Sequence, residues 1–131
     1  MERIRLNNND YYKNSIVSIY IETITNGNLY KTITEKTWDP LIKGHFILPF
    51  GPSRFVKYVS TKGWRLPTFI NYSYDFIVDD QRRFDAFAKE LDRLCSLDMD
   101  TWRQLWLDNL DIIEYNKSQL NNRPYDYRSE E

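Results

Sequence analysis

The stretch TEKTWDPLIKGHFILPFG, residues 34–51, decides the fold, because a helical pattern in its first half gives way to a strand pattern in its second. Leu41 and Ile42 follow Trp38 by three and four residues, which predicts a helix over residues 34–43. The letters HFILPF then form a short apolar run of the length that a buried strand needs. The stretch therefore predicts a helix followed directly by a strand.

A second strand pattern, SIVSIYIETI at residues 15–24, lies upstream and is nearly continuous in apolar and β-branched residues. Such a run is typical of a strand that is covered on both faces. Gly44 ends the intervening helix as a left-handed cap, and Pro40 removes one amide, so we expect that helix to be short and bent or weakened in its first turns. Because a helix joins the two strands, residues 15–22 and 45–50 should be adjacent and parallel in a three-layer α/β unit over residues 15–95.

The next segments are less regular. Gly51, Pro52 and Ser53 turn the chain into a helix that Ser53 can cap and Gly63 can end. The run LPTFIN at residues 66–71 predicts a brief strand. The following YSYDFIVDD predicts an ordered loop that ends in the aspartate cap of the next helix, at position 79 or 80.

Two C-terminal helices are expected, at residues 80–95 and from about Asp100 to residue 119. The apolar face of the first consists of Phe84, Phe87, Ala88, Leu91, Leu94 and Cys95. The predicted fold class is therefore α/β, with a single small Rossmann-like layer, a short and mostly parallel sheet and two C-terminal helices. Residues 1–14 form an N-terminal extension, 15–120 the domain and 121–131 a polar tail.

The composition excludes several classes of function. The chain has 131 residues, 18 basic and 19 acidic, so a nonspecific nucleic-acid surface is not expected. No apolar run approaches a bilayer span, and no secretory signal is present, which predicts a cytoplasmic protein. A single Cys95 and a single His45 cannot supply a tetrahedral zinc site, and we expect neither metal nor cofactor. We interpret His45 as structural or exposed rather than catalytic.

The carboxyl ends of parallel strands form the usual binding crevice, and the following helices begin there. Glu35 and Lys36 stand in the first turn of the helix after the first strand, where free amides and the helix dipole favour an anion. The lysine suits phosphate oxygens and the glutamate suits hydroxyl donors, as in a nucleotide sugar. Alternatively, Thr32 and Glu35 form a capping box and Lys36 is merely solvated.

A longer pattern favours the first interpretation. The chain resembles the donor-binding half of the family that contains the α1,3-fucosyltransferases, which has a two-Rossmann-domain glycosyltransferase architecture. In that family a strand ending in an acid is followed by a TEK triplet that opens a helix, then by a glycine, a short apolar strand and another glycine. The corresponding features here are Glu22, TITEK, Gly44, FILPF and Gly51, and later TFIN with Asp75-Phe76. The resemblance covers roughly residues 15–115.

The resemblance implies that Glu35 accepts hydrogen bonds from ligand hydroxyls and that Lys36 contacts phosphate, with Thr34 and Glu22 also near the donor. GDP-sugars are one candidate ligand. The family's acceptor-binding half, which carries the proposed base, has no counterpart in these 131 residues. We therefore expect a nucleotide-sugar-binding domain in which no residue is assigned a catalytic role. We expect it to be inactive alone and to be completed by a partner subunit or by a homo-oligomer. The alternative is a noncatalytic protein-interaction domain on a glycosyltransferase-like scaffold.

Overall fold

The computed structural model describes residues 16–22 and 35–119; the predicted extension 1–14 and tail 121–131 lie outside these ranges. Its strands are β1 (Val17–Ile21) and β2 (Phe46–Phe50). Its helices are α2 (Glu35–Ile42), α3 (Phe55–Thr61), α4 (Asp80–Cys95), α5 (Met99–Asp108) and α6 (Leu110–Ser118), with a 3₁₀ helix, η1, at Ser73–Phe76. The fold is α/β, a small Rossmann-like layer with a short parallel sheet.

The two strands are neighbours and parallel, as predicted, with Val17 opposite Phe46. The amide of Phe46 donates to the carbonyl of Ile16 (2.9 Å), and the amide of Glu22 donates to the carbonyl of Phe50 (2.8 Å). In a parallel strand, residues of one parity direct both backbone groups to the same neighbour. Even-numbered residues of both strands therefore bond across the pair, and odd-numbered residues direct their backbone groups to the outer edges.

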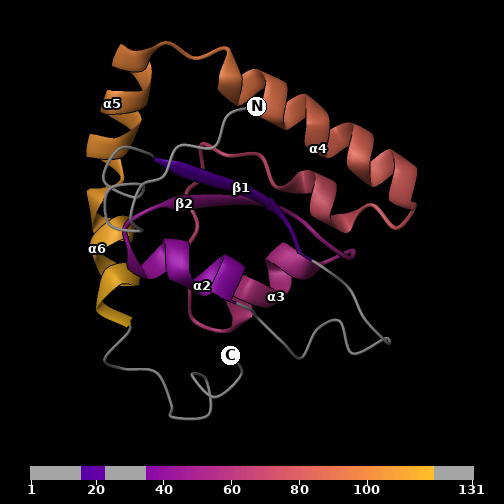
Figure 1. Ribbon diagram of the computed structural model, residues 1–131, viewed down its shortest axis with the longest axis horizontal. Helices are drawn as coiled ribbons and strands as arrows, with labels where there is room; N and C mark the ends of the chain where they lie inside the picture. Colours follow the sequence, from indigo (N-terminus) through magenta and orange to yellow (C-terminus); the bar gives the residue numbers. More distant parts are fainter. Residues whose placement is uncertain (1–15, 23–34, 120–131) are drawn as a thin grey trace, which may run out of the picture.

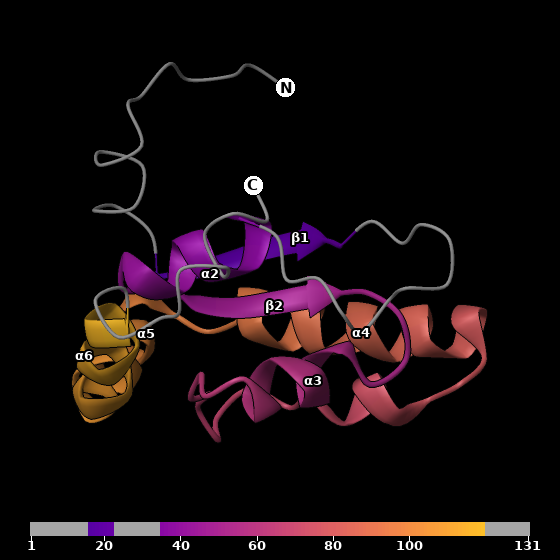
Figure 2. The same cartoon turned by 90° about the horizontal axis from the view of Figure 1, so that it is seen from below.

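Helices lie on both faces of this sheet, but they cover β2 more fully than β1. The prediction that β1 is covered on both faces is wrong, because Ile19 is 49% and Ile21 is 63% exposed. Figure 1 shows α2 and α3 on one face, α4 on the other, and α5 and α6 across the amino ends of the strands. Side chains alternate accordingly: Phe46 and Leu48 belong to the cluster with Phe87 of α4, whereas Ile47 packs with Phe55 of α3. Figure 2 shows β1 and α2 along one margin of the described fold, with α3 on the β2 side. The predicted three layers are present.

The outer edge of β2 is closed by side chains. Ile47 and Pro49 have the odd parity that directs their carbonyls outward, and these carbonyls accept hydrogen bonds from the hydroxyls of Tyr72 (2.6 Å) and Tyr74. Pro49 has no amide to offer. Burial raises the pKa of both tyrosines far above their ordinary value, so both hydroxyls keep their protons and remain donors. This edge is therefore unavailable to a further strand.

The predicted strand at 66–71 is wrong, because this segment forms no strand in the structure. Side chains from distant elements satisfy its backbone and that of the residue before it. Asn116 of α6 accepts from the amide of Arg65 (3.0 Å) and donates to its carbonyl (2.9 Å). Glu90 accepts from the amide of Asn71 (2.7 Å). The segment thus lies against β2, where the rings of Phe69 and Phe46 have centroids 5.1 Å apart, without pairing with it as a strand.

The helix ends follow from local chemistry. Gly44 has φ +92°, which confirms the predicted left-handed end of α2, and Pro40 lies inside that helix. The predicted helix from about Asp100 begins earlier, because Asp98 accepts from the amide of Thr101 (2.7 Å), and it is interrupted at Asn109. The amide group of the Asn109 side chain donates to the carbonyl of Leu105 (2.8 Å), a bond that competes with helix continuation. Two helices, α5 and α6, result.

Glu90 is a buried carboxylate on α4 whose ionised form stabilises the fold. Burial raises the pKa of Glu90. Hydrogen bonds from Arg93 and from the Asn71 amide, together with the charge of Arg93, lower it by more, so the net pKa lies below its ordinary value. For an acid with a lowered pKa, the stabilisation is present above the unfolded pKa and is lost as the pH falls through the folded one. The contribution of Glu90 is therefore complete at neutral pH and disappears in acid.

Glu90→Gln should lower the free energy of unfolding by about 1–3 kcal/mol at pH 7, and by much less at pH 3. Urea denaturation at a series of pH values measures both. Glu114→Gln, at an exposed position on α6, is the control and should leave the acid dependence of the wild type in place. An equal loss at pH 7 and pH 3 in the Glu90 variant would contradict the ionic origin of the effect.

Candidate functional site

The carboxyl edge of the sheet is where β1 ends and α2 begins, and a chain of three polar side chains joins the two. The hydroxyl of Thr37, in the first turn of α2, donates to Oε2 of Glu22 at the end of β1 (2.9 Å). The hydroxyl of Tyr20 lies 2.6 Å from the same Thr37 oxygen. Because Thr37 has one proton and gives it to Glu22, Tyr20 must be the donor in the second bond. The order is Tyr20 to Thr37 to Glu22.

The three side chains of this hydrogen-bonded series are buried or half-buried. Thr37 is fully buried and Glu22 is 5% exposed. Desolvation raises the pKa of Tyr20 well above its ordinary value, and the hydrogen bond to Thr37 only partly offsets the rise. Tyr20 therefore keeps its proton and its donor role. These two hydrogen bonds hold the first turn of α2 against the end of β1.

The predicted site residues lie as follows. Glu22 is at the carboxyl end of β1 and directs its carboxylate to Thr37. Lys36 is exposed in the first turn of α2, next to Thr37 in sequence. Glu35 is the first residue of α2, but its side chain lies outside the described part of the structure, as does Thr34 altogether. The structure thus brings Glu22 and the turn carrying Lys36 to the same edge.

A second helix, α3, also begins at this edge, and its first turn is already occupied by an anion of the chain itself. The carboxylate of Asp75, in η1, accepts from the amides of Val56 (2.8 Å) and Lys57 (3.0 Å). Burial raises the pKa of Asp75, although these amides and the charge of Arg83 pull it down. Asp75 therefore accepts hydrogen bonds from the first-turn amides of α3, as a bound phosphate does at the start of other helices.

The predicted cap of this helix, Ser53, is wrong. The residue preceding α3 is Arg54, in the left-handed region at φ +70°, and no side chain at that position caps the helix. The hydroxyl of Ser53 donates to the carbonyl of Asp75 instead (3.3 Å). A cap supplied from some twenty residues downstream leaves no pattern near the helix start, so sequence reasoning had no signal for Asp75 in this role.

Arg83 is a further residue that sequence reasoning missed, because a charged residue on a surface helix is expected to face solvent. Its side chain is 3% exposed in this structure. Its Nε donates to the carbonyl of Gly51 (3.0 Å), directly after β2, and its Nη1 donates to the carbonyls of Ile77 (3.1 Å) and Val78 (3.0 Å). Arg83 therefore fastens the segment after η1 to the carboxyl end of β2.

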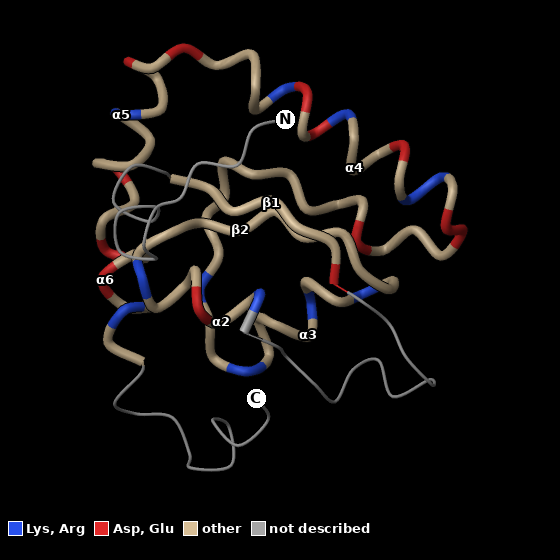
Figure 3. Tube along the Cα trace, in the orientation of Figure 1, with Lys and Arg blue, Asp and Glu red and all other residues tan. Residues whose placement is uncertain are grey.

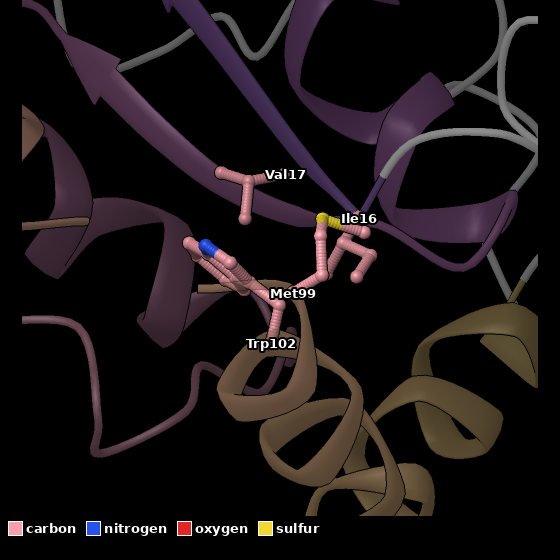
Figure 4. A pocket seen from close by; sticks show the side chains of 4 residues that line it. All are labelled: Ile16, Val17, Met99 and Trp102. Carbon is pink, nitrogen blue, oxygen red and sulfur yellow. The ribbon is translucent and has the colours of Figure 1, made fainter. Parts of the chain in front are cut away.

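The opposite edge holds different chemistry. His45 is buried at the amino end of β2, and its Nδ1 lies 2.7 Å from the hydroxyl of Ser18, which agrees with a structural rather than a catalytic histidine. Near the same edge a pocket of about 230 Å³ lies between β1 and α5. Figure 4 shows its wall, formed by Ile16, Val17, Met99 and Trp102. These side chains are uncharged and mostly apolar, so the described lining offers a phosphate no positive charge.

Charged residues of both signs are spread along the described part of the chain. Figure 3 shows acidic and basic residues interleaved along α4 and no charge along the two strands themselves. In residues 16–22 and 35–119, no three His, Cys, Asp or Glu side chains are grouped as metal ligands. No helix in this described part has the length and apolar character needed to cross a membrane. Comparison of the chain with protein-family models, with curated proteins and with solved structures gives no match.

Proposed function

We propose that the first turn of α2 binds the diphosphate of a nucleotide sugar, with binding rather than transfer as the activity of this chain. The observation that carries the proposal is the hydrogen bond between Thr37 and Glu22 (2.9 Å), which holds that turn at the carboxyl end of β1. Ligands of open α/β sheets bind outside the carboxyl ends of the strands. Lys36 is exposed in this turn and supplies a positive charge for phosphate oxygens.

The two helix starts at this edge are not equivalent, and the difference favours α2. The first turn of α3 already binds the carboxylate of Asp75 through the amides of Val56 and Lys57. An external phosphate would have to displace a buried internal anion there. The first turn of α2 instead carries an exposed lysine, and the residue before Lys36 is the glutamate of the TEK triplet. Phosphate on Lys36 and hydroxyls on Glu35 would match the two ends of a nucleotide sugar.

Glu22 has a supporting role in this proposal. Its carboxylate is buried and receives the Thr37 hydroxyl, so it holds the binding turn in position rather than reaching a ligand directly. The hydroxyl of Tyr20 completes the support from the neighbouring position on the same face of β1. Groups that bind a ligand are effective when such neighbours fix their geometry.

The test is a titration of the ¹⁵N-labelled chain with GDP-sugars, UDP-sugars, free nucleotides and inorganic phosphate, followed by NMR. We expect saturable shifts at millimolar ligand in the α2 region. Lys36→Ala should weaken binding about tenfold, the effect of one charge-assisted hydrogen bond. Lys89→Ala, at an exposed position on α4, is the matched control and should bind as the wild type does. Absence of saturable shifts with all four ligand classes would overturn the proposal and leave the noncatalytic interaction domain.

A further inference from the structure

The charge of this chain is segregated along its sequence, although the totals nearly cancel. From Pro40 to Tyr74 there is no acidic residue, and this stretch contains five basic ones: Lys43, Arg54, Lys57, Lys62 and Arg65. The rest of the chain then holds 13 basic residues and all 19 acidic ones. The net charge of −1 therefore conceals a stretch with a charge of +5. The charge of one face, rather than that of the whole chain, governs the local attraction of an anion.

Four of the five cations gather around α3. Arg54 directly precedes the helix, Lys57 lies in its first turn, Lys62 follows its last residue, and Arg65 lies three positions further on; all four residues are exposed. The helix buries its apolar side in the core, so its remaining positions form the outer side. Figure 3 shows basic positions and no acidic one along α3. We call these four residues the basic α3 surface.

The two acidic residues that flank the stretch do not neutralise this surface. Asp39 lies 3.6 Å from the ammonium group of Lys43, the one cation of the stretch outside the basic α3 surface. Asp75 is buried, and its carboxylate accepts hydrogen bonds from the backbone amides of Val56 and Lys57 rather than from a lysine side chain. The exposed cations around α3 therefore keep a net positive charge among the described residues.

Aromatic rings lie beside three of these cations. The guanidinium of Arg54 is 5.7 Å from the ring centroid of Phe76, and that ring belongs to a residue that is 52% exposed. The ammonium group of Lys62 is 5.1 Å from the ring of Tyr58, and the guanidinium of Arg65 is 3.8 Å from the ring of Tyr115. The surface thus presents cations and partly exposed ring faces together.

We propose that the basic α3 surface binds single-stranded nucleic acid, with its four cations on phosphates and an unpaired base stacked on Phe76. Proteins that bind single strands combine a positively charged track for the backbone with aromatic side chains for the bases. A duplex offers its phosphates but keeps its bases stacked inside, so it would leave the ring of Phe76 unused. An acidic peptide would satisfy the cations only. The combination of charge and rings therefore favours a single strand.

Fluorescence anisotropy with a labelled oligouridylate of about 16 nucleotides, the upper site size of a single-strand-binding domain, tests the proposal. We expect saturable binding at about 50 mM salt. The logarithm of the binding constant should fall with the logarithm of the salt concentration with a slope of about −2.8, because each phosphate contact to a single strand contributes about −0.7.

The double variant Lys57→Gln, Lys62→Gln should reduce the magnitude of this slope by about 1.4 and weaken binding at least about tenfold at the lower salt. Arg82→Gln, Lys89→Gln is the matched control, because it removes the same charge from exposed positions on α4, and it should bind as the wild type does. Far-ultraviolet circular dichroism checks that each variant folds.

A further variant separates stacking from charge. Phe76→Ala should weaken binding at least about fivefold, the effect of one stacked base. It should leave the salt slope at the wild-type value, because the ring carries no charge. A Phe76 variant that binds as the wild type does, or a duplex of the same length that binds as tightly as the single strand, would overturn the assignment to single strands.

The remaining outcomes concern the surface itself. Absence of saturable binding by the wild type, or equal losses in the α3 and α4 double variants, would overturn the proposal. Binding of an oligoglutamate but not of the oligouridylate would also overturn it and would assign the basic α3 surface to an acidic segment of a protein partner.

Discussion

Replacing Phe87 by alanine should lower the free energy of unfolding by about 3–5 kcal/mol, the usual cost of removing a buried phenylalanine. Phe87 is 5% exposed and lies in the cluster between α4 and the sheet. Its ring centroid lies 5.4 Å from those of both Phe50 and Tyr74 and 6.1 Å from that of Phe84, so the substitution also removes three aromatic contacts. The cavity would open where β2, η1 and α4 meet.

Phe84→Ala, one turn earlier on the same helix, is the matched control for this measurement. Phe84 is 44% exposed, although its ring also contacts Phe50. We expect it to cost no more than about 1 kcal/mol, because much of its surface is already in water. Urea denaturation followed by tryptophan fluorescence compares the two. Surface substitutions usually change the free energy of unfolding by no more than about 0.5 kcal/mol. A loss within that range for Phe87→Ala, or equal losses for the two variants, would contradict the burial of this face.

Arg83→Met should lower the free energy of unfolding by about 2–4 kcal/mol, although the apolar part of the side chain is retained. The substitution removes the donors to the carbonyls of Gly51, Ile77 and Val78. Buried acceptors left without donors carry their full desolvation cost. It also removes the nearby positive charge that lowers the pKa of Asp75, so the carboxylate at the start of α3 becomes harder to ionise.

Arg82→Met makes the same chemical change at the preceding, exposed position and is the control for Arg83. It should alter stability by no more than about 0.5 kcal/mol. Thermal and urea denaturation of both variants at pH 7 give the comparison. If Arg82 and Arg83 variants lose the same stability, the carbonyl contacts of Arg83 contribute nothing beyond general helix effects.

The strand, helix, strand order could be predicted because its signals are local. Three local signals lie around Gly44: apolar residues three and four apart predict the helix, the glycine predicts its end, and a continuous apolar run predicts the strand. The structure has α2, then Gly44 at φ +92°, then β2. The Asp79 cap was predictable for the same reason, since its carboxylate accepts from the amide of Arg82, three residues on (2.9 Å). Local chemistry therefore decided most helix boundaries.

The elements that the sequence did not predict correctly depend on contacts between distant residues. The strand expected at 66–71 does not form, and distant side chains bond to backbone groups in and beside this segment. Glu90 accepts from the amide of Asn71, and Asn116 contacts Arg65 across 51 positions. Asp75 caps a helix that precedes it in the chain, and Arg83 turns inward toward Gly51. No pattern within a single element carries such pairings. The site prediction placed Glu22 and Lys36 at one edge, but not the threonine and tyrosine that hold them there.

The two tyrosine hydroxyls on the outer carbonyls of β2 also decide how far sheet pairing can spread. Ile47 and Pro49 offer no open acceptors on that side, and Pro49 offers no amide, so the sheet formed by the described residues has at most one edge that another strand can join. Strand addition at a single edge can only close a pair, so the occupied β2 edge keeps the described sheet from elongating by continuous strand addition.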